Sequence, residues 1–186
     1  MDLFATRRAG VLLHPTSLPG LGSRGKLGAD ARRFVDWLAA GAFSVWQTLP
    51  LGVPDAYGSP YGLRSAYAGD PELIDSADLE AVERLPARID AAGDRTARYA
   101  SFAAHATVEQ RHAFAKFLRR RRRWLLPYGL FELMSARFGG APWWQWPAEY
   151  RDIEPTALRD CLARNRSQLR ALYFEQYLFE LQWFAL

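Results

Sequence analysis

The last sixteen residues of the chain, 171–186 (ALYFEQYLFELQWFAL), place the strongest constraint on its fold. On a helix they direct apolar side chains all the way round instead of along one stripe, and such a helix must be covered on every side. Two glutamates and two glutamines argue against a membrane span. No glycine, lysine or arginine terminates the segment. We therefore expect its cover to come from sequence beyond Leu186, with the chain truncated there.

Composition narrows the class of protein. A chain of 186 residues is one long domain or two short ones, and its net charge of +4 comes from interspersed acids and bases, which gives no indication of an acidic partner. Cys161 is the one cysteine, so no intrachain disulfide can form, as in a reducing compartment. The apolar run after Arg7 and Arg8 is too short for a secretion signal. We expect a cytoplasmic protein.

The first seventy residues have the pattern of a βαβ unit. Short apolar strands are predicted at residues 10–14 and 43–49, with a helix over 29–40 that ends at Gly41. Strands joined in this way are nearly always parallel, and function in such folds lies in the loops after the strands. The inner side of the helix is expected to carry Phe34, Val35, Trp37 and Leu38.

The loop after the second strand, residues 50–71, is long enough to be functional and is rich in tyrosine. From Asp75 onward the pattern becomes helical. Helices are predicted over 72–84, 95–106 and 109–125, followed by an aromatic turn at 139–147 and a last long helix opened by Pro155. We therefore divide the chain into a βαβ unit (residues 1–74) and a helical part (residues 75–186).

Several motifs have a structural interpretation as well as a functional one. The basic run at 119–123 wraps right round a helix, which favours a solvated surface over a nucleic-acid site. His14, at a strand end, is either a polar residue bonded to a neighbouring loop or a substrate contact. A GxGxxG match at residues 20–25 stands apart from its strand and lacks the acidic residue of a dinucleotide site. We read that segment as a flexible loop.

The sequence offers no catalytic set that can be assigned from spacing. The three histidines lie far apart, so metal binding is not expected. Glycoside chemistry needs two carboxylates on either side of the sugar bond. Asp55, Asp70 and Asp75 lie near the carboxyl end of the second strand, but no partner carboxylate is visible at another strand end.

Three blocks of sequence resemble the amino-terminal part of the 4-α-glucanotransferase family, also called amylomaltase or disproportionating enzyme. They are GVLLHPTSLPG at 10–20, VWQTLPLG at 45–52, and SPY at 59–61 followed by SAYAG at 65–69. FGGAPWWQWP at 138–147 and the pair Gln182-Trp183 agree with the same family. The resemblance covers nearly the whole chain, and the blocks follow the family's order.

This resemblance implies an α/β fold, an incomplete (β/α)₈ TIM barrel made of its first βαβ unit and a mostly helical insertion. It implies transfer of α-1,4-glucan segments between maltodextrins by a retaining mechanism, with no cofactor, no metal and no membrane or nucleic-acid partner. Ser59 and Tyr61 would line the donor sugar site, and Tyr57 would stack on bound glucan. Packing of these tyrosines against the barrel rim is the alternative.

The resemblance also implies that the catalytic carboxylates are not in this chain. The family's aspartate nucleophile, acid/base glutamate and third aspartate would lie beyond the last helix. Directly after two of the matched blocks, Gly62 stands where the family usually has glutamine, and Asp70 replaces an asparagine. We expect a fragment that is inactive alone. A non-catalytic glucan-binding or interaction module is the alternative, and a nucleic-acid binder that uses the arginine run is a weaker one.

Overall fold

The computed structural model describes residues 7–19, 24–55, 57–90 and 92–186 of the chain. The chain forms two compact units. One comprises Met1–Val82 together with Leu178–Leu186, and the other comprises Glu83–Tyr177. We describe each in turn.

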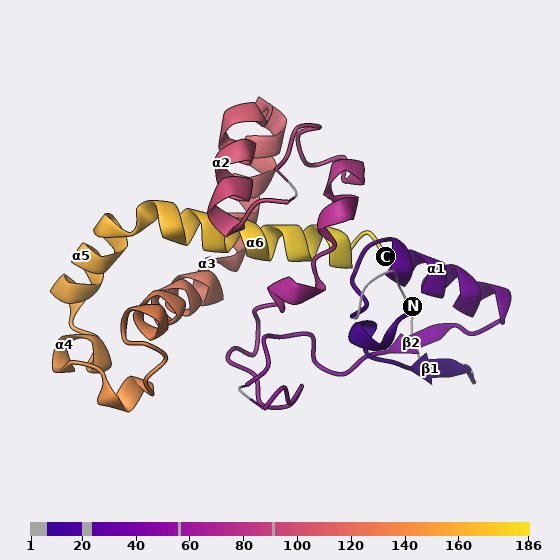
Figure 1. Cartoon of the computed structure of the whole chain (residues 1–186), viewed down its shortest axis with the longest axis horizontal. Helices are drawn as coiled ribbons and strands as arrows, with labels where there is room; N and C mark the ends of the chain where they lie inside the picture. The colour runs from indigo at the N-terminus through magenta and orange to yellow at the C-terminus, as the bar shows by residue number, and fades with distance from the viewer. Residues whose placement is uncertain (1–6, 20–23, 56, 91) are drawn as a thin grey trace. The chain divides into compact units, whose positions relative to one another are not determined.

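The first unit contains the predicted βαβ arrangement. Strands β1 (Gly10–Leu12) and β2 (Val45–Gln47) pair in parallel, with Val11 opposite Trp46, and helix α1 (Ala29–Ala40) connects them (Figure 1). The prediction of parallel strands joined by a helix over 29–40 is confirmed. Each strand is only three residues long, shorter than expected, because the chain turns into the 3₁₀ turn η1 (Pro15–Ser17) just after β1.

On the face of α1 that periodicity indicates, Leu38 is buried and Phe34 and Val35 are half-buried, and Trp37 is the exception. Trp37 is 56% exposed, so its assignment to the inner side was wrong. The indole stacks on Phe34 at 5.7 Å and on Phe43 at 5.9 Å between ring centroids. Trp37 therefore gains its contacts by lying flat over neighbouring rings at the edge of the face.

The prediction of a helix over 72–84 is wrong. The chain there forms two 3₁₀ turns, η2 (Pro71–Leu73) and η3 (Ser76–Ala81). Asp70 and Asp75 cap these turns by accepting from the amides of Glu72 and Ala77. The side-chain amide of Gln182 bonds both the N–H and the C=O of Asp75, each at 2.9 Å. The Asp75 amide thus bonds a side chain, and the Asp75 carbonyl also accepts from the Asp78 amide at 3.2 Å, in the i to i+3 pattern of a 3₁₀ turn.

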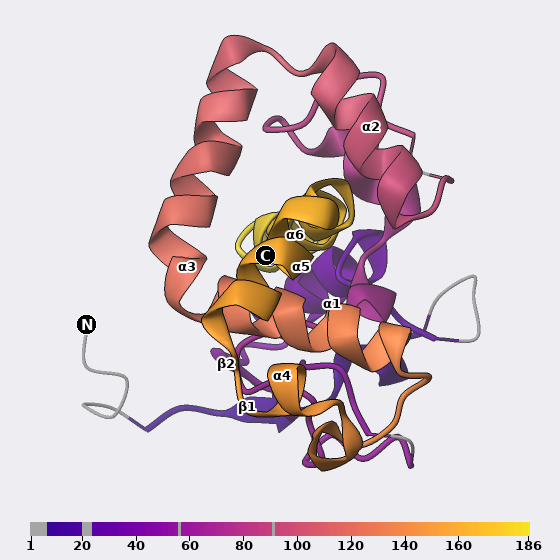
Figure 2. The same cartoon turned by 90° about the vertical axis from the view of Figure 1, so that its left-hand side faces the viewer.

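The second unit is helical (Figure 2). Helix α2 (Arg95–His105) follows the prediction closely, and a capping box of Thr107 and Gln110 starts α3 (Val108–Arg137). Expected to end at Leu125, α3 continues through Pro127, and Figure 2 shows it bending along its length. Proline in a helix interior removes one hydrogen bond and kinks the chain, but need not stop it when neighbouring residues are packed.

The chain turns after α3 and continues through four short or medium elements. The 3₁₀ turn η4 (Trp143–Gln145) and α4 (Ala148–Arg151) lead to α5 (Pro155–Arg164) and α6 (Arg166–Trp183). The single long helix predicted after Pro155 is therefore two helices. The break falls at Asn165, whose side-chain amide donates to the Cys161 carbonyl at 2.8 Å and competes with the helical ladder.

Helix α6 is covered within this chain, so the expectation that its cover must come from absent sequence is wrong. In the second unit Phe174 is 0% exposed. Its ring lies 4.5 Å from Phe102 and 5.6 Å from Phe114 between centroids. The buried Glu175 pairs with Arg95 at 2.7 Å. The apolar periphery of the helix thus reflects a central position in its own fold.

The carboxyl-terminal turns of α6 are used in the same way within the first unit. Gln182 is 1% exposed and bonds Asp75, as described above. Phe179 lies so close to Gly69 that a Cβ on that glycine would be 2.4 Å from the ring.

Among the described residues, we find no helix with the length and apolar character needed to cross a membrane.

Truncating Phe174 should strongly destabilise the second unit. Phe174→Ala removes a fully buried ring that contacts Phe102 and Phe114, and such changes cost about 3–5 kcal/mol. Urea unfolding followed by far-UV circular dichroism measures this. Phe184→Ala is the matched control, because Phe184 is 71% exposed. Equal losses for the two variants would contradict the assignment of Phe174 to the core.

Candidate functional site

The loop that follows β2 is an ordered hairpin-like structure. Gly52 and Gly69 form an antiparallel bridge at its base, and Pro54 and Leu63 form a second bridge further along. At the closing end the Asp70 amide donates to the Leu51 carbonyl at 2.7 Å. We call residues 52–70 the tyrosine loop. Its described residues, 52–55 and 57–70, are held by backbone bonds at several levels.

One carboxylate organises the tip of the tyrosine loop. The Oδ1 atom of Asp55 accepts from the amide of Tyr57 at 3.0 Å and from the amide of Ser59 at 3.1 Å. The Gly58 amide donates to the Asp55 carbonyl at 3.0 Å, and Gly58 has φ = 73°. That left-handed conformation suits glycine, which carries no Cβ. The tip is thus a tight turn built around Asp55.

The predicted site residues lie together at this tip. Ser59 is half-buried, and its hydroxyl oxygen accepts from the Tyr61 amide at 3.3 Å. Tyr57 is 95% exposed and Tyr61 is 75% exposed, so neither ring is packed against the rest of the first unit. Exposed tyrosines offer flat apolar faces for sugar rings and hydroxyls for hydrogen bonds.

Tyr67 is a further candidate that sequence reasoning left out of the site. It belongs to the same loop and is 72% exposed. Ser65 shapes its backbone, since the Ser65 hydroxyl oxygen accepts from the amides of Tyr67 and Ala68 at 3.1 and 3.2 Å. The sequence feature that could have identified Tyr67 is its position in the long, tyrosine-rich loop.

The loop ends at an ion pair between a buried aspartate and an exposed arginine. Asp70 is 4% exposed, and its Oδ2 atom accepts from Arg24 at 2.9 Å. Its Oδ1 atom accepts from the Glu72 amide at 3.0 Å. An asparagine could keep the hydrogen bond to the Glu72 amide. It would lose the charge–charge attraction to Arg24. The aspartate at this position therefore ties the end of the tyrosine loop to the segment that contains Arg24.

His14 lies just after β1 and serves its own turn. Its Nδ1 atom lies 2.7 Å from the Thr16 hydroxyl oxygen and caps η1. Partial burial lowers the pKa of the imidazole below its usual 6.5, and the positive charge of Arg24 adds to this effect. The hydrogen bond to the Pro50 backbone and the charge of Asp70 oppose it. This geometry supports the polar strand-end reading of His14; the substrate contact stays a prediction.

The three aspartates near the tyrosine loop are all engaged in local structure. Asp55 holds the loop tip, Asp70 pairs with Arg24, and Asp75 caps η3. Within the described ranges, no group of three or more His, Cys, Asp and Glu side chains could hold a metal ion. These carboxylates act on the backbone and on arginine.

In the glycine-rich segment, the described glycines Gly25 and Gly28 lie close to neighbouring groups of the first unit. Gly20 and Gly22 lie outside the described residues. A Cβ on Gly28 would lie 2.0 Å from the Asp75 carboxylate, and one on Gly25 would lie 2.3 Å from the Pro15 carbonyl oxygen. Both glycines permit close approach of neighbouring groups of the protein.

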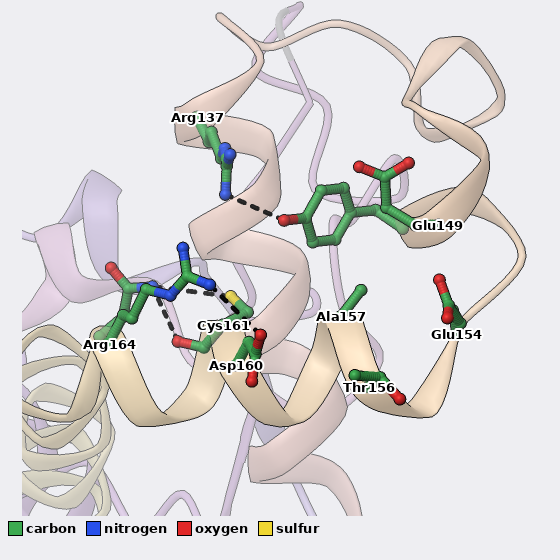
Figure 3. Close-up of a pocket in the computed structure, with 10 residues that line it drawn as sticks. Arg137, Glu149, Glu154, Thr156, Ala157, Asp160, Cys161 and Arg164 are labelled. Carbon is green, nitrogen blue, oxygen red and sulfur yellow. Dashed lines mark hydrogen bonds and ion pairs between the residues drawn. The ribbon is translucent and has the colours of Figure 1, made fainter.

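A hollow lies in the helical unit, between the end of α3 and helices α4 and α5 (Figure 3). Its volume is about 350 Å³. Arg137 donates to the Tyr150 hydroxyl at 3.1 Å, and Arg164 pairs with Asp160 at 3.2 Å. Because these lining charges already have protein partners and are exposed, we do not assign this hollow to the function.

The chain belongs to the 4-α-glucanotransferase family. A family model described as 4-alpha-glucanotransferase matches residues 13–186. The 4-alpha-glucanotransferase of Thermus thermophilus is 39% identical over 198 residues, which cover 97% of this chain and 39% of that protein. The Synechocystis 4-alpha-glucanotransferase is 35% identical over 198 residues, which cover 95% of this chain and 39% of that protein.

A solved structure agrees with this assignment. The chain is similar to amylomaltase from Streptococcus agalactiae, determined in complex with acarbose, with a TM-score of 0.82 and 27% identity. The match covers 96% of this chain and 40% of that chain. This chain therefore spans about two fifths of the length of the relatives that it matches.

Acidification should destabilise the first unit through His14. Its pKa is lowered on folding, so the stability it provides is present above the ordinary pKa of about 6.5 and is lost as the pH falls below it. His14→Gln should reduce the fall in melting temperature between pH ~7 and pH ~5. His112→Gln, on the exposed surface of α3, is the control. An unchanged pH dependence in His14→Gln would contradict this account.

Proposed function

We propose that the chain acts in the transfer of α-1,4-glucan segments between maltodextrins, and that the tyrosine loop is where it contacts the glucan. The observation that carries this proposal is an ordered loop with exposed tyrosines in a chain of the 4-α-glucanotransferase family. Tyr57 stacks on a sugar ring, while Ser59 and Tyr61 line the donor sugar. This assigns the chain to glycogen and maltodextrin metabolism, in the cytoplasm.

The fold proposal follows from the same family. Residues 1–74 are the first βαβ unit of a (β/α)₈ barrel, and residues 75–186 are a mostly helical insertion with the terminal helix. The parallel pairing of β1 with β2 across α1 supports this, because a barrel is built from such units. The tyrosine loop follows the carboxyl end of β2, the side on which barrel enzymes carry their active sites.

The chemistry requires more than the described residues provide. Retaining transfer uses two carboxyl groups about 5 Å apart, one as nucleophile and one as acid and base. Asp55, Asp70 and Asp75 are occupied by loop, ion-pair and capping contacts. The part that this chain plays is to bind and orient the glucan, and we expect the isolated chain not to catalyse transfer.

A non-catalytic glucan-binding or interaction module is the second candidate. The structural use of all three aspartates near the loop favours it. Incubation with maltotriose tests whether the isolated chain transfers glucan, which neither candidate expects. Production of glucose and longer maltodextrins by the chain alone would show transfer and would contradict our expectation that the isolated chain is inactive.

The chain should bind maltoheptaose weakly, through the tyrosine loop. Two stacking rings and few further contacts give an affinity in the millimolar range, about 4 kcal/mol. Tyr57→Ala and Tyr61→Ala should each weaken binding by roughly fivefold, since one aromatic contact contributes about 1 kcal/mol. Amide shifts in an NMR titration measure this.

Phe184→Ala is the control for this titration, since Phe184 is an exposed aromatic residue outside the loop. Its affinity should equal that of the unmodified chain. Micromolar binding that survives both tyrosine substitutions would show that the sugar site lies elsewhere.

A further inference from the structure

The three predicted sugar-contact residues depend on one carboxylate oxygen. Oδ1 of Asp55 accepts from the amides of Tyr57 and Ser59 at 3.0 and 3.1 Å. The Ser59 hydroxyl oxygen then accepts from the Tyr61 amide at 3.3 Å. The backbone positions of both exposed rings and of the serine are therefore set by a relay that starts at Asp55.

The second oxygen of the same carboxylate occupies space beside Gly62. The bridge between Pro54 and Leu63 brings the two sides of the loop together at this level. A Cβ built on Gly62 would lie 2.2 Å from Asp55 Oδ2 and 2.8 Å from its Cγ. The absence of a side chain at position 62 is what lets the carboxylate reach the tip of the loop.

The rings cannot fix this geometry themselves. Tyr57 and Tyr61 are 95% and 75% exposed, so burial contributes little to holding them. A loop that is already ordered binds more tightly, because the free energy of ordering it is not subtracted from the affinity.

From these contacts we propose that Asp55 is the positioning residue of the tyrosine loop, and that the space beside Gly62 allows it to take this role. Asp55 does not touch the sugar. Its carboxylate pre-orders Tyr57, Ser59 and Tyr61 for the ligand. The role in binding rests on the proposed function, whereas the ordering of the loop is independent of it.

The first experiment measures loop order without ligand. ¹⁵N relaxation of the whole chain should give order parameters of about 0.85 at Tyr57 and Ser59, and Asp55→Ala should lower them to about 0.6 or below. Asp55→Asn should retain the order, because an amide oxygen accepts the same two bonds. Asp36→Ala, an exposed aspartate on α1, is the control. An ordered loop in Asp55→Ala would overturn the proposal.

A double-mutant cycle tests the link to Gly62. Gly62→Ala should disorder the loop as Asp55→Ala does, because its methyl group displaces the carboxylate. The double variant should be no more disordered than Asp55→Ala alone, since both changes remove the same contact. Additive effects, or an ordered loop in Gly62→Ala, would show that position 62 does not act through Asp55.

Maltoheptaose titration completes the test. Asp55→Ala should weaken binding by roughly three- to tenfold and Asp55→Asn by much less, because ordering the loop then opposes binding. Unaltered affinity in a disordered Asp55→Ala loop would overturn the role in binding. If the unmodified chain shows no shift at the loop, the proposed function fails, while the relaxation data still decide whether Asp55 orders the loop.

Discussion

Burial of helix α6 is the constraint on which most of this structure depends. A helix with apolar side chains all round needs neighbours on every side. In the helical unit α2 and α3 supply Phe102 and Phe114 around Phe174. Two buried polar side chains on α6 have partners as well, since Glu175 pairs with Arg95 and Gln182 bonds the backbone of Asp75. An unpaired polar group at such depth would be costly.

The burial of α6 also involves the segment that follows the tyrosine loop. The backbone of Asp75 bonds Gln182, and the chain there forms short 3₁₀ turns capped by aspartates. Gly69, at the base of the loop, must remain free of a Cβ because the Phe179 ring occupies that space. Contacts of the last helix thus determine where the tyrosine loop can close.

The carboxylates around the loop show how local structure competes with chemistry for the same residue type. A free aspartate near a sugar site is a candidate acid or nucleophile. Here Asp55 accepts two amide bonds and Asp70 is buried against Arg24. Both carboxylates thus have structural roles in the tyrosine loop. These roles are compatible with a chain that spans about two fifths of the length of its relatives.

The sequence by itself determined the features that depend on local pattern. Apolar periodicity and Gly41 give α1, a helix between two strands gives their parallel pairing, and the ordered blocks give the family. The sequence also singled out the long loop with Tyr57, Ser59 and Tyr61, which the structure brings together at one tip. Each of these rests on neighbours in the chain.

Tertiary structure alone decided what depends on distant partners. Gln182 lies 107 residues from Asp75, so no local pattern could show that the two residues bond each other. The continuation of α3 through Pro127 and the exposure of Trp37 follow from surrounding contacts that propensity does not contain. The cover of α6 is likewise non-local. Residues far apart in the sequence surround it, and only folding brings them together.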